Sequence, residues 1–396
     1  MNFRTILILG ALSAFGPLAI DFYLPAFPAM ALAFGTDEQH VQQTLAAYFL
    51  GLSIGQLAYG PVADRFGRRL PLLIGVGLFT AASLACAYAP NLQWLIAARF
   101  VQALGGCAGM VISRAVVSDK CDAVGSAKVF SQLMLVMGLA PILAPMLGGV
   151  LVNTTGWQSI FLALTGFSAL AGLAVAFGLP ESMPAHLPRQ PMSGALRQYG
   201  RLLKDSVYLG HALTGGIAIA GMFSYIAGSP FVLIKLYGVP AEHFGWFFGA
   251  NAAGFILVAQ VNARLLAKRG PAFLLSRAVW VYLGAGLALL AVSAMHTAQL
   301  WPLLIPLFVC IASLGCILPN ASACAMNGQG ARAGSASAML GCIQFSVAAG
   351  AAALVGILHD GSAMPMAMVI SLCAILVVGV AMLTRRLQNA RALVKA

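Results

Sequence analysis

The chain has 396 residues, of which 61% are hydrophobic and only 8% are charged, with a formal net charge of +12. Soluble domains contain about 25% charged residues, and a water-soluble fold of this length could not hide so much apolar surface. The composition therefore excludes most soluble proteins and predicts an all-α polytopic protein whose main partner is the lipid bilayer.

Apolar runs of membrane-spanning length follow one another along the whole chain. A spanning helix needs about 20 apolar residues, so the runs predict twelve transmembrane helices in two six-helix bundles. The predicted spans are approximately 5–33, 42–61, 71–89, 92–113, 128–151, 157–179, 207–234, 242–262, 272–294, 299–320, 333–357 and 364–384.

The first run is long for a straight span. Its prolines Pro17, Pro25 and Pro28 predict a kinked or tilted helix. A cleavable signal peptide is the alternative, but the run continues past any cleavage site and contains an acid, Asp21.

The cationic residues predict the orientation. With the N-terminus inside, all but two of the 22 lysines and arginines fall on the inner side, and the exceptions are Arg99 and Lys235. This asymmetry follows the positive-inside rule and predicts that both termini are cytoplasmic. It also accounts for the basic charge without a nucleic-acid partner.

A polar segment divides the predicted spans into six and six. We expect an N-terminal bundle at 1–180, a central cytoplasmic loop at 181–206 and a C-terminal bundle at 207–396, with a basic loop after the second span of each half. Two such repeats are typical of transporters. The eight cysteines form no C-x-x-C pair, so neither a metal site nor a disulfide framework is expected.

The loop after the second span reads G-P-V-A-D-R-F-G-R-R. Gly60 and Gly67 are expected at a tight turn where two helices approach closely. Asp64 can accept hydrogen bonds, and Arg68 can reach a carboxylate. The acid candidates for Arg68 are Asp119 and Asp122, and Arg114 is the candidate partner of Asp64. The alternative is a basic loop whose only role is to set the orientation of the chain in the membrane.

This loop resembles the G-x-x-x-D-R-x-G-R-[RK] motif of the major facilitator superfamily. The resemblance implies a cytoplasmic gate that holds the outward-facing state. The expected gate residues are Gly60, Asp64, Arg65, Gly67, Arg68, Arg69, Arg114 and Asp119.

Two further elements resemble the same superfamily. Arg99 and Gln102 fit the R-x-x-Q-x-x-G element of the fourth span. An arginine in hydrocarbon normally faces the bundle interior and has a partner, although Arg99 could also snorkel to the outer surface. The fifth span resembles the Gly/Pro motif of antiporters, and the residues expected to kink this helix are Gly138, Pro141, Pro145, Gly148 and Gly149.

A motif in the first span narrows the resemblance to one branch of the superfamily. Residues 21–28 read D-F-Y-L-P-A-F-P and resemble the first-span element of the bicyclomycin and chloramphenicol resistance (Bcr/CflA) drug:proton antiporters. Asp21 is the only carboxylate well inside a predicted span. Because burial and nearby cations shift the pKa of a carboxyl group in opposite directions, Asp21 could exchange a proton, with Arg99 as a candidate partner. A structural cap near the outer surface is the alternative.

The sequence departs from the pattern of some drug antiporters at one position of the first span. Those antiporters have a second acid there, whereas this chain has Ser13, which suggests a one-proton cycle.

Polar and adaptable side chains inside the apolar runs are candidates for the substrate cavity. They are Tyr48, Gln102, Met134, Met137, Tyr225, Asn251 and Gln344. The polar ones are equally suited to hydrogen bonds between helices, and methionine is also ordinary filler in membrane helices.

These features together imply a proton-coupled exporter of small amphipathic drugs in a bacterial inner membrane. No G-x-x-x-x-G-K-[ST] pattern is present, so we expect a proton gradient and no cofactor as the energy source. A monomer is expected. An importer or exporter of a nutrient or metabolite is the second hypothesis, because fold does not settle substrate or direction. An enzyme is the third: residues 51–55 fit G-x-S-x-G, but they lie in an apolar helix rather than a strand–turn–helix.

Overall fold

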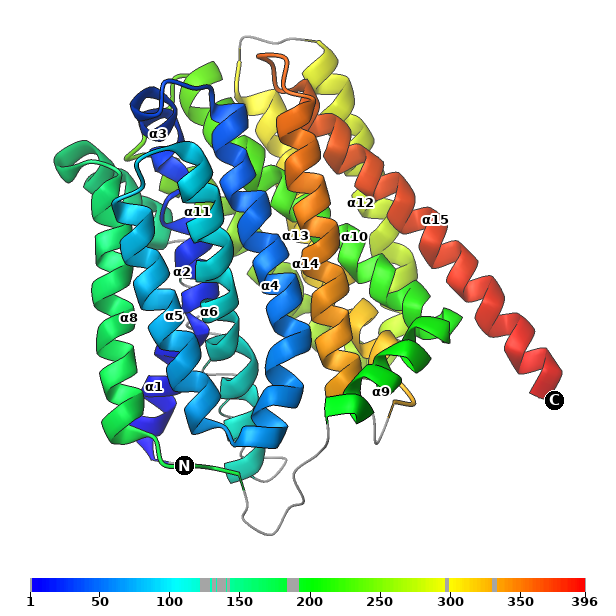
Figure 1. The fold of residues 1–396 in the computed structure, drawn as a ribbon. Coiled ribbons are helices and arrows are strands. Elements are labelled where there is room, and N and C mark those ends of the chain that lie inside the picture. Colours follow the sequence, from blue (N-terminus) through cyan, green and yellow to red (C-terminus); the bar gives the residue numbers. More distant parts are fainter. Residues whose placement is uncertain are drawn as a thin grey trace. The chain divides into compact units, whose positions relative to one another are not determined.

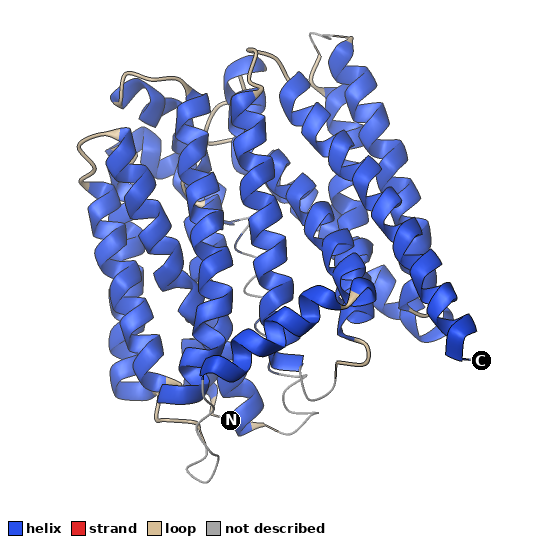
Figure 2. Ribbon diagram, turned by 45° about the vertical axis from the view of Figure 1, so that its right-hand side comes forward, coloured by secondary structure: helices blue, strands red, loops and turns tan. Residues whose placement is uncertain are grey.

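The computed structural model describes residues 2–121, 129, 133, 140, 143–183, 192–295, 299–329 and 333–395. All regular elements in these ranges are helices (Figure 2), which confirms the predicted fold class. Among the described residues, eleven helical segments are long and apolar enough to cross a membrane, and a shorter apolar helix covers Leu143–Thr155. That shorter helix is the described part of the predicted fifth span.

The first span is broken into four pieces, as its prolines predict. They are α1 (Phe3–Ser13), α2 (Phe15–Asp21), the 3-10 turn η1 (Leu24–Ala26) and α3 (Phe27–Ala33). Pro25 and Pro28 each lie in the first turn of a new piece, where a missing N–H costs least. Asp21 therefore stands at the last residue of α2, just before the break.

The packing divides the chain into two compact units. Unit 1 consists of Met1–Leu196 and Ala241–Trp246, and unit 2 of Arg197–Pro240 and Phe247–Ala396. The domain boundaries at 180 and 206 stay a prediction.

Unit 1 contains α4 (Glu38–Phe66), α5 (Arg69–Ala87), α6 (Leu92–Lys120) and α8 (Gln158–Gly178). In Figure 1, α5 lies between α6 and α8, and α4 packs on α6. Small residues allow this close packing: a Cβ on Gly105 of α6 would collide with the backbone of Phe79 and Gly75 in α5.

The pieces of the first span and the helix Leu143–Thr155 also belong to unit 1, and unit 2 contains the helices that follow α8. They are α9 (Met192–Lys204, which begins in unit 1), α10 (Ser206–Ser229), the π-helical turn η2 (Pro230–Leu236), α11 (Phe244–Arg269, which also begins in unit 1), α12 (Pro271–Ala294), α13 (Trp301–Met326), α14 (Ala333–Ile357) and α15 (Met364–Lys395). Helix α10 packs against α13, α14 and α15, and α12 packs against α13 and α15.

The link between the second and third spans is much shorter than the predicted loop. Helix α4 continues to Phe66 and α5 begins at Arg69, so most of the Gly60–Arg69 motif is helical. The expectation that Gly60 forms a turn is wrong: Gly60 lies inside α4, with nothing within 4 Å of the place of a Cβ. Gly67 makes the turn, with φ +88°, and Gly270 does the same between α11 and α12 with φ +72°.

Candidate functional site

Arg99 lies inside unit 1 and has no exposed surface, which excludes the snorkelling alternative. Its Nη1 donates to Gln102 Oε1 at 2.5 Å, and its Nη2 donates to the carbonyl oxygen of Ala19 at 2.8 Å. The guanidinium carbon is 4.2 Å from the ring centroids of both Tyr23 and Tyr48. A planar cation between two aromatic faces is a strong arrangement in a dry interior.

The polar contacts around Arg99 continue across neighbouring helices. Gln102 donates from Nε2 to Ser83 Oγ of α5 at 2.7 Å. The hydroxyls of Tyr23 and Thr44 lie 3.2 Å apart. Tyr23, Ser83 and Thr44 were not among the predicted site residues, although Tyr23 belongs to the D-x-Y-L-P element. We call Arg99, Gln102, Tyr23 and Tyr48 the Arg99 site.

Asp21 is buried, with 4% of its surface exposed. The expected pairing with Arg99 is not found: among the described residues, no hydrogen bond or ion pair involves the Asp21 carboxylate. Instead, Nη1 and Nη2 of Arg99 bind Gln102 and the Ala19 carbonyl, and its buried Nε has no hydrogen-bond partner among the described residues. Because Ala19 precedes Asp21 by two residues in α2, Arg99 holds the helix that contains the acid rather than the acid itself.

Two neighbouring glycines of the fifth span make close contacts, one of them with the residue that follows Asp21. A Cβ on Gly148 would collide with the carbonyl oxygen of Phe22, and one on Gly149 would lie 2.5 Å from the Ala241 carbonyl oxygen. Pro145 is on the same helix, Leu143–Thr155. The other predicted residues of this region, Gly138, Pro141, Met134 and Met137, lie outside the described residues.

The remaining predicted cavity residues are in unit 2. Asn251 of α11 donates to the Tyr225 hydroxyl of α10 at 3.1 Å, and Tyr225 stacks on Phe248 with ring centroids 5.4 Å apart. Gln344 of α14 lies near Gly215 of α10. The Asn251–Tyr225 bond joins two helices, as the structural alternative predicted, so no substrate role follows from it.

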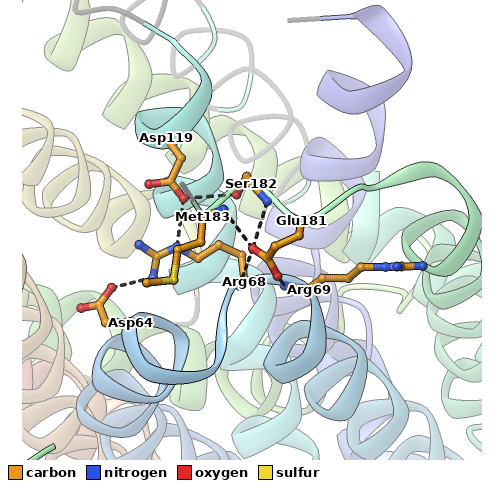
Figure 3. Close-up of polar contacts among 7 residues, drawn as sticks. All are labelled: Asp64, Arg68, Arg69, Asp119, Glu181, Ser182 and Met183. Atoms are coloured by element: carbon orange, nitrogen blue, oxygen red, sulfur yellow. Dashed lines mark hydrogen bonds and ion pairs between the residues drawn. The ribbon is translucent and has the colours of Figure 1, made fainter. Parts of the chain in front are cut away.

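A second cluster surrounds Arg68 at the end of unit 1 where α4 meets α5 (Figure 3). Arg68 donates from Nη1 to Asp64 at 2.5 Å and from Nε to Asp119 at 3.0 Å. The contact with Asp119 was one of the two predicted alternatives and is confirmed; Asp122 lies outside the described residues. Asp64 accepts from Arg68, and the expected pairing of Asp64 with Arg114 stays a prediction. The two carboxylates outweigh the effect of burial and raise the pKa of Arg68.

Glu181 completes this cluster. It is not among the gate residues expected from the sequence. Its carboxylate accepts from the backbone N–H groups of Arg68 at 2.9 Å and of Arg69 at 3.1 Å, so it caps the N-terminus of α5, which has no cap of its own. Partial burial acts to raise the pKa of Glu181, but its backbone N–H donors outweigh that effect and lower it. The carboxylate is therefore ionised at neutral pH.

The other residues of the motif surround this cap. Ser182 donates to Asp119 at 3.1 Å, and the side chain of Arg69 extends away from Arg68 (Figure 3) to the carbonyl oxygen of Ala176 at 2.5 Å. Arg65 is exposed and lies over Phe66. We call Asp64, Arg68, Asp119, Glu181 and Ser182 the Arg68 cluster.

Replacing Gly67 by Ala is expected to lower stability by about 1–3 kcal/mol, because its backbone conformation is one that only glycine adopts readily. The new Cβ would also lie 2.6 Å from Glu181 Oε2. Thermal unfolding in detergent measures the effect. Gly60→Ala in the same motif is the control and should unfold at or slightly above the wild-type temperature, because alanine is favoured over glycine inside a helix. Equal midpoints for the two variants would contradict the role given to Gly67.

Comparison with known proteins agrees with these features. The family model for the Major Facilitator Superfamily matches residues 7–353. A transporter of Bacillus subtilis described as the uncharacterized MFS-type transporter YdgK is 39% identical over 93% of this chain and 92% of its own length. The bicyclomycin resistance protein homolog of Haemophilus influenzae is 31% identical over 95% and 94% of the two chains.

A third relative and a solved structure extend the comparison. Multidrug resistance protein D of Escherichia coli is 29% identical over 87% of this chain and 86% of that protein. The inward-facing, unoccupied structure of a bacterial homolog of the human lysosomal transporter Spinster matches with TM-score 0.72 at 14% identity, over 98% of both chains. At that identity the structure shows the fold alone.

These relatives confirm the resemblance to the bicyclomycin-resistance branch. The chain belongs to the major facilitator superfamily and is a multi-pass membrane transporter rather than an enzyme.

Proposed function

We propose that the chain is a proton-coupled exporter that moves small amphipathic drugs out of the cytoplasm by alternating access. The observation that carries the proposal is Asp21: a buried carboxyl group at a break in the first span, without an ion-pair partner among the described residues. No described residue holds this group in its charged form by an ion pair, so it is suited to exchange a proton. The relatives named for bicyclomycin and multidrug resistance support drugs as the substrates.

Coupling requires only that proton and drug favour different conformations. A ligand shifts a conformational equilibrium by its differential affinity for the two states. If the protonated transporter favours one access state and the drug-bound, deprotonated transporter the other, inward proton movement drives export. The Arg99 site supports this role because it fixes α2 beside Asp21 without neutralising the acid.

The positive-inside distribution supports an orientation with both termini in the cytoplasm. The Arg68 cluster is then on the cytoplasmic side, where its ion pairs would stabilise one access state. We propose that the protein lies in a bacterial inner membrane, works as a monomer and needs no cofactor beyond the proton gradient.

Growth tests decide between export and import. Overproduction of the chain in an efflux-deficient host is expected to raise tolerance to a panel of amphipathic antibiotics, and overproduction of the Asp21→Asn variant is not. Rescue of growth on a limiting nutrient, with drug tolerance unchanged, would favour the alternative of a proton-coupled nutrient or metabolite transporter and would contradict drug export.

Asp64→Asn is expected to reduce drug transport several-fold without lowering the amount of protein in the membrane. The amide keeps the size of Asp64 but removes the charge that pairs with Arg68. Efflux of a fluorescent drug, normalised to membrane content, measures it. Lys120→Gln changes an exposed charge at the end of α6 and should behave as wild type. Full activity in Asp64→Asn would count against the gate.

A further inference from the structure

Helix α9 has an unusual sequence for this chain. Its 13 residues, M-S-G-A-L-R-Q-Y-G-R-L-L-K, contain three cations and no acid. Arg197, Arg201 and Lys204 are all exposed. They are spaced by four and three residues, so they lie along one edge of the helix. We call them the basic edge of α9.

A second side of α9 is buried against unit 2. Tyr199 and Leu202 are 7% and 1% exposed. Gln198 accepts a hydrogen bond from Ser335 Oγ, in the first turn of α14, at 2.6 Å. These contacts hold α9 in a fixed place and leave its other sides uncovered.

A third side has exposed leucines. Leu196 and Leu203 are 71% and 52% exposed. They are seven residues apart, so both point to the same side of the helix. We call them the leucine edge of α9. Because Tyr199, Leu202 and the partly buried Gln198 form the side that packs on unit 2, packing within the described part of the protein does not explain the leucine edge.

The position of α9 places these edges at the boundary of the membrane. Helix α9 ends at Lys204, and the span formed by α10 and η2 begins at Ser206. Asp205 between them caps α10 by accepting from Val207 N–H at 3.2 Å. Ser335, which contacts α9, lies in the first turn of another span, α14. In Figure 1, α9 runs obliquely across the end of α10. It therefore lies at the level where both spans begin.

We propose that α9 is a binding site for anionic phospholipid headgroups. The leucine edge enters the boundary between headgroups and acyl chains, and the basic edge binds the phosphates. A helix with a leucine side beside a lysine and arginine side is the pattern of helices that lie in the membrane interface. The charges also match, because in the described part of the chain no carboxylate forms an ion pair with Arg197, Arg201 or Lys204.

The test uses the purified full-length protein, delipidated in detergent. Phosphatidylglycerol or phosphatidylcholine with identical acyl chains is added, and bound lipid is counted by native mass spectrometry. We expect the wild type to retain phosphatidylglycerol in preference to phosphatidylcholine. Each cation near an anionic surface contributes about fivefold in affinity, so the triple variant Arg197→Gln, Arg201→Gln, Lys204→Gln should weaken phosphatidylglycerol binding by up to about 100-fold.

A matched variant distinguishes a specific lipid site on α9 from a general effect of the protein's net charge. Arg264→Gln, Arg385→Gln and Arg386→Gln also remove three exposed cations from unit 2, and this variant should keep the preference. Equal losses in the two triple variants would overturn the proposal. Leu196→Ser with Leu203→Ser should also weaken phosphatidylglycerol binding, with an unchanged unfolding temperature. Displacement of the lipid by millimolar glycerol phosphate would assign the basic edge to a soluble anion and would overturn the lipid site.

Discussion

Asp21→Asn is expected to abolish drug-driven proton release by the purified transporter and proton-driven drug transport in vesicles. Asparagine has nearly the size of aspartate but cannot ionise, so the packing at the end of α2 is kept while the exchangeable proton is lost. Because no described residue pairs with the carboxylate, removing its charge leaves no cation unpaired nearby. The variant should therefore fold normally and still bind drug. Proton release is read with a pH-sensitive dye in weakly buffered detergent solution.

Two comparisons define this experiment. Asp360→Asn removes an exposed acid outside the spans and should leave drug-driven proton release unchanged. Asp21→Glu keeps an ionisable group and should retain part of the coupling, with a changed pH dependence. Proton release at the wild-type level in Asp21→Asn would show that another group exchanges the proton and would overturn the proposed mechanism.

Much of the fold could be predicted because the bilayer imposes it. An apolar run of about 20 residues has few alternatives to a helix, and the prolines of the first span mark its breaks. The ends of the spans are predicted less well, because polar residues do not mark where a membrane helix ends. Helix α4 continues through Asp64 and Arg65 to Phe66, since a helix can extend beyond the hydrocarbon layer without cost.

The candidate site was predictable where its residues belong to one motif. Arg68 and Asp64 are one helical turn apart, and their contact follows local geometry. Glu181 is 113 residues from Arg68, and no local pattern joins them. One signal was available: Arg68, the residue before α5, stands where a Ser, Thr, Asp or Asn usually caps a helix. A helix start of this kind needs an acceptor from elsewhere, and Glu181 directly follows the sixth span.

The Arg99 site shows another limit of the sequence. A buried arginine predicts a partner but does not identify it. Asp21 was the natural candidate by charge, yet the structure uses an amide, a backbone carbonyl and two tyrosine rings. These neutral partners bind Nη1 and Nη2 of the guanidinium, its Nε has no hydrogen-bond partner among the described residues, and no described residue pairs with the acid. The pairing of opposite charges, usually a sound expectation, fails here because Arg99 binds neutral groups on its own helix and on α2 instead.

Arg99→Lys is therefore expected to be a severe substitution although it keeps the charge. An ammonium group cannot reproduce the fork that binds Gln102 Oε1 and the Ala19 carbonyl oxygen together. Each buried acceptor left without a donor costs about 1–3 kcal/mol, and weaker stacking between the tyrosines adds to this. We expect a loss of about 2–4 kcal/mol in stability and, because Ala19 is released beside Asp21, loss of proton-coupled transport as well.

Substitutions of Tyr48 distinguish the contribution of its aromatic ring from that of its hydroxyl group. The Tyr48 hydroxyl is buried, with no hydrogen-bond partner among the described residues, so Tyr48→Phe should keep both stability and transport. Tyr48→Leu removes the aromatic face over Arg99 and should lower the unfolding temperature in detergent, because a desolvated cation–π contact contributes about 2 kcal/mol. Wild-type stability in both Arg99→Lys and Tyr48→Leu would mean that the guanidinium does not hold α2 in place, and the link from Arg99 to Asp21 would then be lost.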